Sequence, residues 1–179
     1  MKGIVFTEFI EMVEDRFGML TVDKMIEGAS LGHSAGYTAV GTYPHSEMVQ
    51  LIVSLSETTG IELPDLLFEY GKHFFMVLAK SYPVFFEQHD SALNFLQTIE
   101  DYIHPEVLKL YPDAELPRFD MERVSEIHLR MKYYSSRKMS EFARGLILAT
   151  LAHFGEEGDV TMELLEADGS IVQFEVIKK

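Results

Sequence analysis

Apolar residues recur at three- and four-residue steps through roughly the first 110 positions of the chain, which is the spacing of amphipathic helices. The first such stripe consists of Ile4, Val5, Phe9, Met12, Val13 and Phe17. By this pattern we expect helices over residues 4–17, 22–27, 46–58, 64–80 and from 91 to about 102. Pro64 suits a first helical turn, and Ser91 can act as an N-cap. Residues 28–43 are rich in Gly, Ser and Tyr and predict a loop.

After Pro117 the period changes, because apolar and polar residues begin to alternate, as on a half-buried strand. The alternating apolar residues are Ile127, Leu129, Met131 and Tyr133. A helix is expected over residues 138–153, and two further alternating runs flank a tight turn at Asp168-Gly169. The predicted class is therefore α+β, with a helical N-terminal lobe and a C-terminal lobe whose small antiparallel sheet carries one inserted helix.

The length of 179 residues is that of one domain. We expect a single domain over residues 1–179, with a helical lobe at about 1–60 and a second lobe at about 61–179. An interface between lobes is a common place for a ligand, so the cofactor or substrate is expected there.

The charge balance excludes several kinds of partner. With 29 acidic and 15 basic side chains the net charge is -14, which repels nucleic acid and anionic membrane surfaces. No apolar run approaches the roughly 20 residues of a spanning helix, and the N-terminal apolar stretch is too short for a signal peptide. We expect a soluble, cytoplasmic protein. Because cysteine is absent, any metal must be held by His or a carboxylate.

Histidine is therefore the first residue type to examine for a metal site. The seven are His33, His45, His73, His89, His104, His128 and His153, and no two have the spacing of a metal clip. His104 lies at a helix junction, and Pro105 after it can begin a new helical turn. His104 can serve there as a single axial ligand, or it can simply cap or pack at the boundary.

A second candidate group lies at the end of the alternating strand. Tyr133, Ser135 and Arg137 are two residues apart and so share one face. Two hydroxyls and a guanidinium suit a pair of carboxylates, such as the propionates of haem. The 13 Phe and 10 Met could line an apolar slot for such a ligand, or form an ordinary core. A string this short also arises by chance at a strand end.

In combination, Met1-Lys2-Gly3 opening a helix, His104, and Tyr-x-Ser-x-Arg at residues 133–137 resemble the H-NOX haem domains over essentially the whole chain. The resemblance implies that the chain binds haem b, iron protoporphyrin IX, with His104 as the proximal iron ligand. It also implies that Tyr133, Ser135 and Arg137 hold the propionates and that Pro117 presses on the haem.

The same resemblance implies a distal wall formed by Val5, Phe9, Phe74, Leu78, Phe142 and Leu146. Oxygen-binding relatives place a tyrosine hydroxyl at the position of Phe142, whereas none of these six side chains has a donor. We therefore expect a five-coordinate ferrous haem that binds nitric oxide and carbon monoxide and excludes dioxygen. Release of His104 on nitric oxide binding is a further hypothesis. Gly71, beside this wall, is either a point of flexing or a site of close packing.

A domain of this family without an output of its own implies a sensor, not an enzyme, that regulates a separate histidine kinase or diguanylate cyclase/phosphodiesterase. Acidic residues could form the docking face or merely a solvated surface: Glu11, Glu14, Asp15, Glu156, Glu157 and Asp159. Two alternatives remain open. One is a haem-free protein-interaction or lipid-binding module, and the other is a haem enzyme, which needs a polar distal acid–base pair.

Overall fold

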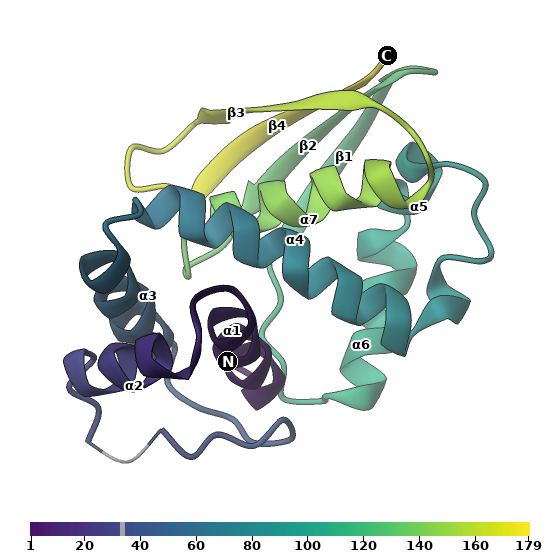
Figure 1. Cartoon of the computed structure of the whole chain (residues 1–179). Coiled ribbons are helices and arrows are strands. Elements are labelled where there is room, and N and C mark those ends of the chain that lie inside the picture. Colours follow the sequence, from purple (N-terminus) through teal and green to yellow (C-terminus); the bar gives the residue numbers. More distant parts are fainter. Residues whose placement is uncertain (33–34) are drawn as a thin grey trace.

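The computed structural model describes residues 1–32 and 35–179 of the chain, so His33 and Ser34 of the expected loop lie outside the described residues. Three helices gather on one side of a long fourth helix (Figure 1). They are α1 (Gly3–Phe17), α2 (Met19–Gly28) and α3 (His45–Thr59), and the long helix is α4 (Leu63–Ser81). These four elements match the predicted helices, with ends that differ by a few residues.

The apolar stripe of α1 is buried against α2, α3 and α4. Phe9, Met12 and Val13 are at most 1% exposed, as the periodicity predicts, and Phe6 joins them at 0%. Val5 is only half-buried, because the N-terminal end of α1 borders a cavity instead of the core. The apolar stripe of α1 therefore packs in the helical core along most of its length and lines the cavity at its N-terminal end.

Between α4 and the sheet the chain forms the short 3₁₀ helix η1 (Pro83–Phe85), α5 (Ala92–Gln97), the π-helix η2 (Ile99–Ile103) and α6 (His104–Leu110). The hydroxyl of Ser91 accepts the N–H of Asn94 at 3.3 Å, so Ser91 is the N-cap, as predicted. The continuous helix predicted from 91 to about 102 is divided in the structure, because α5 ends before Thr98 and η2 follows it. The carbonyl of Thr98 accepts the N–H of Tyr102 (2.9 Å) and that of Ile103 (3.0 Å), which widens the next turn. π-Helical turns are frequent at functional sites.

The four-stranded antiparallel sheet has the order β1-β2-β4-β3. Its strands are β1 (Arg118–Ser125), β2 (His128–Tyr134), β3 (Gly158–Leu164) and β4 (Ile171–Lys178). In β2, Leu129, Met131 and Tyr133 are at most 2% exposed, as predicted, whereas Ile127 is 54% exposed and lies in the turn before the strand. Strand β1 was missed, because Phe119 is its one buried residue and most other positions are polar or charged.

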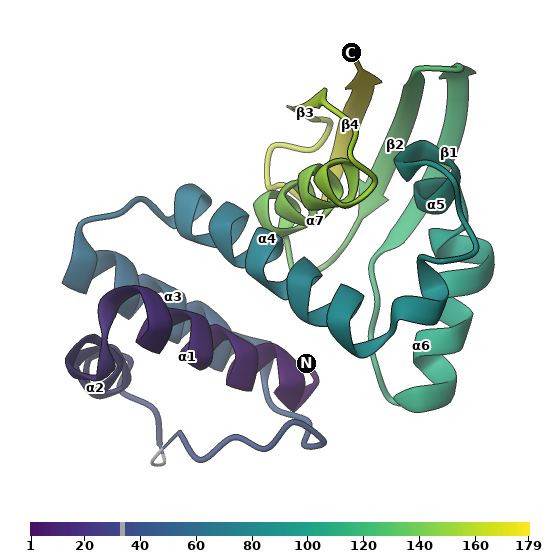
Figure 2. The ribbon, with the colours of Figure 1, turned by 45° about the vertical axis from the view of Figure 1, so that its right-hand side comes forward.

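Helix α7 (Ser140–His153) covers one face of the sheet and lies beside α4, as Figures 1 and 2 both show. Two glycines permit the close approach of α4 and α7. A Cβ on Gly71 would lie 2.2 Å from the carbonyl oxygen of Phe142, and one on Gly145 would lie 2.2 Å from that of Phe68. The surroundings of Gly71 therefore favour close packing as its role.

Two apolar clusters result. One joins α1, α2 and α3 to Tyr70 and Phe74 of α4, and the other joins the sheet, α5 and α7 to Phe75 of the same helix. Helix α4 thus runs between the two clusters and contributes to both. Lys2 adds a polar link, since its Nζ lies 3.0 Å from a carboxylate oxygen of Asp113, beyond α6. Among the described helices, none is both long and apolar enough to span a bilayer.

Candidate functional site

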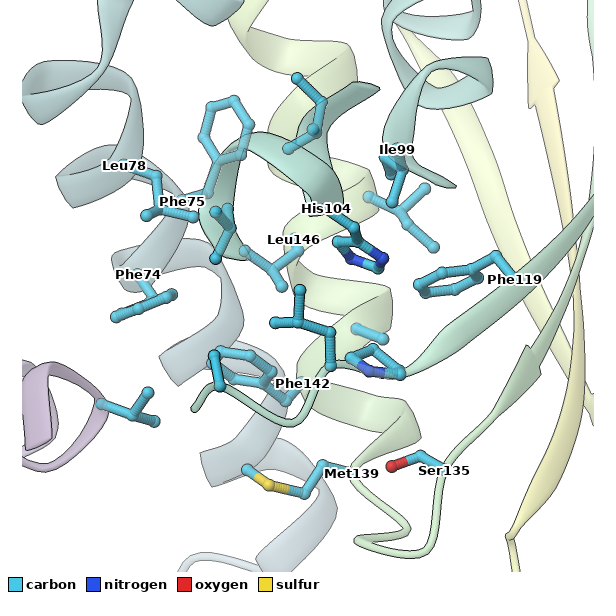
Figure 3. A pocket seen from close by; sticks show the side chains of 18 of the residues that line it. Phe74, Phe75, Leu78, Ile99, His104, Phe119, Ser135, Met139, Phe142 and Leu146 are labelled. Carbon is cyan, nitrogen blue, oxygen red and sulfur yellow. The ribbon is translucent and has the colours of Figure 1, made fainter. Parts of the chain in front are cut away.

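A cavity of about 300 Å³ lies where α1, α4, α6, α7 and β2 meet, and it is lined almost entirely by apolar side chains. Figure 3 shows side chains from these elements around one space, with Phe74 and Leu78 on one side and His104 and Phe119 on the other. A concave apolar cavity with a few polar groups is typical of a small-molecule or cofactor site.

His104 is the first residue of α6, and its side chain is only 16% exposed. Its Nδ1 lies 3.0 Å from Oε1 of Glu100. An ionised carboxylate can only accept, so Nδ1 carries the proton and Nε2 of the neutral ring keeps its lone pair. Burial lowers the pKa of His104, and the neighbouring Glu100 carboxylate opposes that shift. A neutral imidazole with a free Nε2 is the form that ligates a metal.

Tyr133, Ser135 and Arg137 all line the cavity. Ser135 Oγ accepts the backbone N–H of Arg137 at 3.1 Å, and Nη2 of Arg137 donates to Oε2 of Glu115 at 2.8 Å. Burial raises the pKa of Tyr133, so its hydroxyl stays protonated and able to donate. Arg137 thus already binds a carboxylate, that of Glu115, whose side chain is 80% exposed at the rim of the cavity. The donor set therefore fits the propionates of a haem.

On the opposite side, five of the six residues expected in the distal wall line the cavity: Val5, Phe74, Leu78, Phe142 and Leu146. Phe9 is the exception and is corrected here, because it lies one turn further along α1, inside the helical cluster. Its ring packs 5.1 Å from that of Tyr70, which in turn lies 5.0 Å from that of Phe142. Phe9 supports the wall from behind. Pro117, from the loop before β1, also borders the cavity.

Away from the Tyr133 and Ser135 end of the cavity, four hydroxyl groups near it already form hydrogen bonds within the described structure. The buried Tyr70 donates to the carbonyl of Val5, and Thr150 donates to that of Leu146 at 2.9 Å. Tyr82 and Tyr111 bond to each other at 3.2 Å. The side of the cavity formed by α4 and α7 thus presents hydrocarbon surface.

Sequence reasoning missed several residues of this site. Met1, Ile4, Phe75 and Met139 also line the cavity, and their apolar character gave no signal beyond that of a core. Glu100 was missed too, although its position four residues before His104 places the two side chains on one helix face. Among the described residues, no group of three or more His, Cys, Asp or Glu could hold a metal ion.

A neutral imidazole beside an apolar cavity, with an arginine at the rim that already binds a carboxylate, fits a metal cofactor that carries carboxylate groups. The family is shown by a match to the haem-NO-binding (HNOB) family model over residues 2–162, and the chain belongs to that family. Haem is accordingly its cofactor. Proteins of this family are haem-binding gas-sensor domains, not enzymes.

Solved structures agree in fold. An H-NOX protein from K. algicida in the Fe(II) unliganded state is 44% identical, with a TM-score of 0.96, and the match covers 100% of this chain and 97% of that chain. An H-NOX from Shewanella woodyi in the Fe(II)CO state is 34% identical, with a TM-score of 0.84, and the match covers 100% of this chain and 95% of that chain. An H-NOX protein from S. oneidensis in the Fe(II)NO state is 22% identical, with a TM-score of 0.91, and the match covers 100% of this chain and 99% of that chain. No curated protein matches the chain.

Proposed function

We propose that this chain senses nitric oxide, binding it and carbon monoxide at a five-coordinate ferrous haem held by His104, and that it excludes dioxygen. The observation that carries the proposal is the state of His104. Its Nδ1 is fixed by Glu100, which leaves Nε2 of a neutral, largely buried ring for the iron. When bound, the haem supplies a ferrous iron with one coordination position open to a diatomic gas.

The rest of the chain would orient the cofactor. Arg137 would exchange its exposed partner Glu115 for a propionate, and the hydroxyls of Tyr133 and Ser135 would donate to the carboxylates. Pro117 and the apolar residues of α4 and α7 would pack on the ring and exclude water. Carbon monoxide binding is supported by the relative from Shewanella woodyi, whose structure is of the Fe(II)CO state.

Gas selectivity would follow from the α4 and α7 side. Dioxygen is retained by ferrous haem when a nearby donor stabilises the charge that it acquires, whereas nitric oxide needs no such donor. Phe142, Leu146 and Phe74 have no donor, and the hydroxyl of Tyr70 behind them already bonds to Val5. Mixing the ferrous protein with air tests this selectivity. The proposal requires that no stable oxygenated spectrum forms, and an oxygenated spectrum that lasts minutes contradicts it.

The ligand assignment is tested by His104→Gly. We expect the variant to lose most of its haem absorbance and to recover a five-coordinate ferrous spectrum when imidazole is added, because free imidazole fills the space of the missing ring. His89→Gly is the matched control, since His89 does not line the cavity. If His104→Gly retains haem with an unchanged spectrum in the absence of imidazole, the assignment is wrong.

The partner that this domain binds and regulates is proposed to be a histidine kinase or a diguanylate cyclase/phosphodiesterase. The acidic residues considered as a docking face do not support one surface. Glu156 is bonded to Lys178 and to the backbone of Ala92, and α1, which carries Glu11, lies in the other lobe (Figure 2). The test is kinase or cyclase activity measured with the unliganded ferrous protein and with its nitric oxide complex, using each candidate histidine kinase or cyclase of the same organism. Equal activity in both states contradicts a signalling role with that enzyme.

A further inference from the structure

Glu100 lies outside the cavity lining yet touches the residue on which the site depends. One oxygen of its carboxylate, Oε1, lies 3.0 Å from Nδ1 of His104 and accepts the backbone N–H of Phe119 at 2.8 Å. Phe119 is the second residue of β1. A single carboxylate oxygen therefore joins the candidate iron ligand to the edge strand of the sheet.

The local backbone holds this arrangement in place. Glu100 lies in the π-helix η2, and His104 begins α6 immediately after it, so the two side chains share a face at a spacing of four residues. The second partner is a main-chain group of a paired strand, which does not change rotamer. The Glu100 side chain is 28% exposed, and no lysine or arginine of the described chain forms an ion pair with it. Its negative charge is thus directed at the imidazole.

We propose that Glu100 is a positioning residue that fixes the His104 ring and sets the strength of the iron–histidine bond. A carboxylate that accepts from the second nitrogen of a ligating imidazole increases the donor strength of the first. The bond is therefore stronger than with a neutral acceptor and resists rupture when nitric oxide binds on the opposite face. This inference rests on the proposed ligation by His104.

Three variants of the full chain, loaded with haem, test the role of Glu100. Glu100→Gln keeps the shape and an oxygen that can accept, but removes the charge, whereas Glu100→Ala removes both. Asp101→Asn is the matched control, because it removes one negative charge from the adjacent, exposed position of the same π-helix. The main readout is the iron–histidine stretching frequency of the ferrous protein by resonance Raman spectroscopy.

We expect that frequency to fall from wild type to Glu100→Gln and further to Glu100→Ala, with no change in Asp101→Asn. The reduction potential should rise in the same order, because a weaker donor stabilises ferric iron less. The five-coordinate fraction of the nitric oxide complex should rise likewise. Haem transfer to apomyoglobin should be about tenfold faster from Glu100→Ala, at the low end of the effect typical when such a partner is removed.

The outcomes separate this inference from the proposed ligation. If wild type shows an iron–histidine band that disappears in His104→Gly, but both Glu100 variants keep its frequency and the wild-type potential, the role of Glu100 is overturned and the ligation stands. If wild type shows no such band, the ligation itself fails. A shift of equal size in Asp101→Asn also overturns the inference, because general charge then explains the effect.

Discussion

The two sides of the cavity are built by opposite means. On the His104 side, polar contacts fix the key groups: Glu100 holds the imidazole, and Arg137 is paired with a carboxylate at the rim. On the α4 and α7 side, Phe74 and Phe142 present rings, and the nearby hydroxyl of Tyr70 is bonded to a backbone carbonyl.

If the proposed function holds, this difference separates two tasks, cofactor anchoring and gas selectivity. Anchoring a charged cofactor needs directional groups whose charge is matched, because an unpaired buried polar group is costly. Selecting nitric oxide over dioxygen needs an apolar surface instead. Where no hydrogen-bond donor is present, bound dioxygen gains no stabilising hydrogen bond. Changes on the first side should therefore affect haem retention, and changes on the second should affect gas choice.

The largest effect that we expect is on the anchoring side, from Arg137→Ala. Loss of charge-assisted hydrogen bonds to a propionate costs about 1.5–3 kcal/mol, which corresponds to about 10- to 100-fold faster haem loss. Transfer of haem to apomyoglobin, followed by absorbance, measures the rate. Arg130→Ala is the control, because Arg130 pairs with Glu175 and Glu122 and does not line the cavity. Equal rates for both variants would mean that Arg137 does not hold the cofactor.

On the apolar side, we expect Gly145→Ala to lower the stability of the fold, an effect slightly smaller in free energy than that of Arg137→Ala. The new methyl would lie 2.2 Å from the carbonyl oxygen of Phe68, so α4 and α7 must separate. Overpacking of this kind destabilises by about 1–3 kcal/mol, measurable as a lower midpoint of urea unfolding. Gly32→Ala, where nothing lies within 4 Å of the added atom, should show no loss. An unchanged midpoint for Gly145→Ala would show that the helix contact is loose.

Some helices and strands of this fold could be predicted from the sequence, and others could not. Periodicity predicted α1, α3, α4, α7 and the β3–β4 hairpin, because each has a continuous apolar face. It missed β1, whose burial rests largely on Phe119, and it extended α5 through Thr98, where the backbone changes to a π-helix. Such a change depends on packing around the turn and leaves no mark in the apolar spacing.

The candidate site shows the same limit. The motif residues His104, Tyr133, Ser135 and Arg137 do gather at one cavity, whereas Phe9 does not. Periodicity shows which face a residue occupies but not how far along the helix the cavity extends, and Phe9 is about 6 Å further along α1 than Val5. The spacing of four residues between Glu100 and His104 is visible in the sequence, but the second partner of Glu100, Phe119, is 19 positions away and leaves no local pattern.

The next change, Phe142→Tyr, is the sharpest test of the apolar side. It adds a donor to a ring that lines the cavity, and one net hydrogen bond of about 1.4 kcal/mol would prolong dioxygen binding about tenfold. Nitric oxide affinity should stay unchanged. Stopped-flow mixing of the ferrous protein with oxygenated buffer follows the lifetime, with Phe154→Tyr, away from the cavity, as the control. Identical lifetimes would show that the missing hydroxyl does not set gas choice.

The smallest effect is expected for Glu115→Gln, at the rim of the anchoring side. Glu115 is 80% exposed, and such surface ion pairs contribute at most about 1 kcal/mol, so the haem-free fold should lose little stability. The haem-loaded protein should gain, because Arg137 no longer exchanges one carboxylate for another. Haem titration should therefore show an affinity that rises by less than about fivefold, the equivalent of 1 kcal/mol. A lower affinity would mean that Glu115 supports the cofactor and does not compete with it, and the rim would then anchor the haem through a network larger than Arg137.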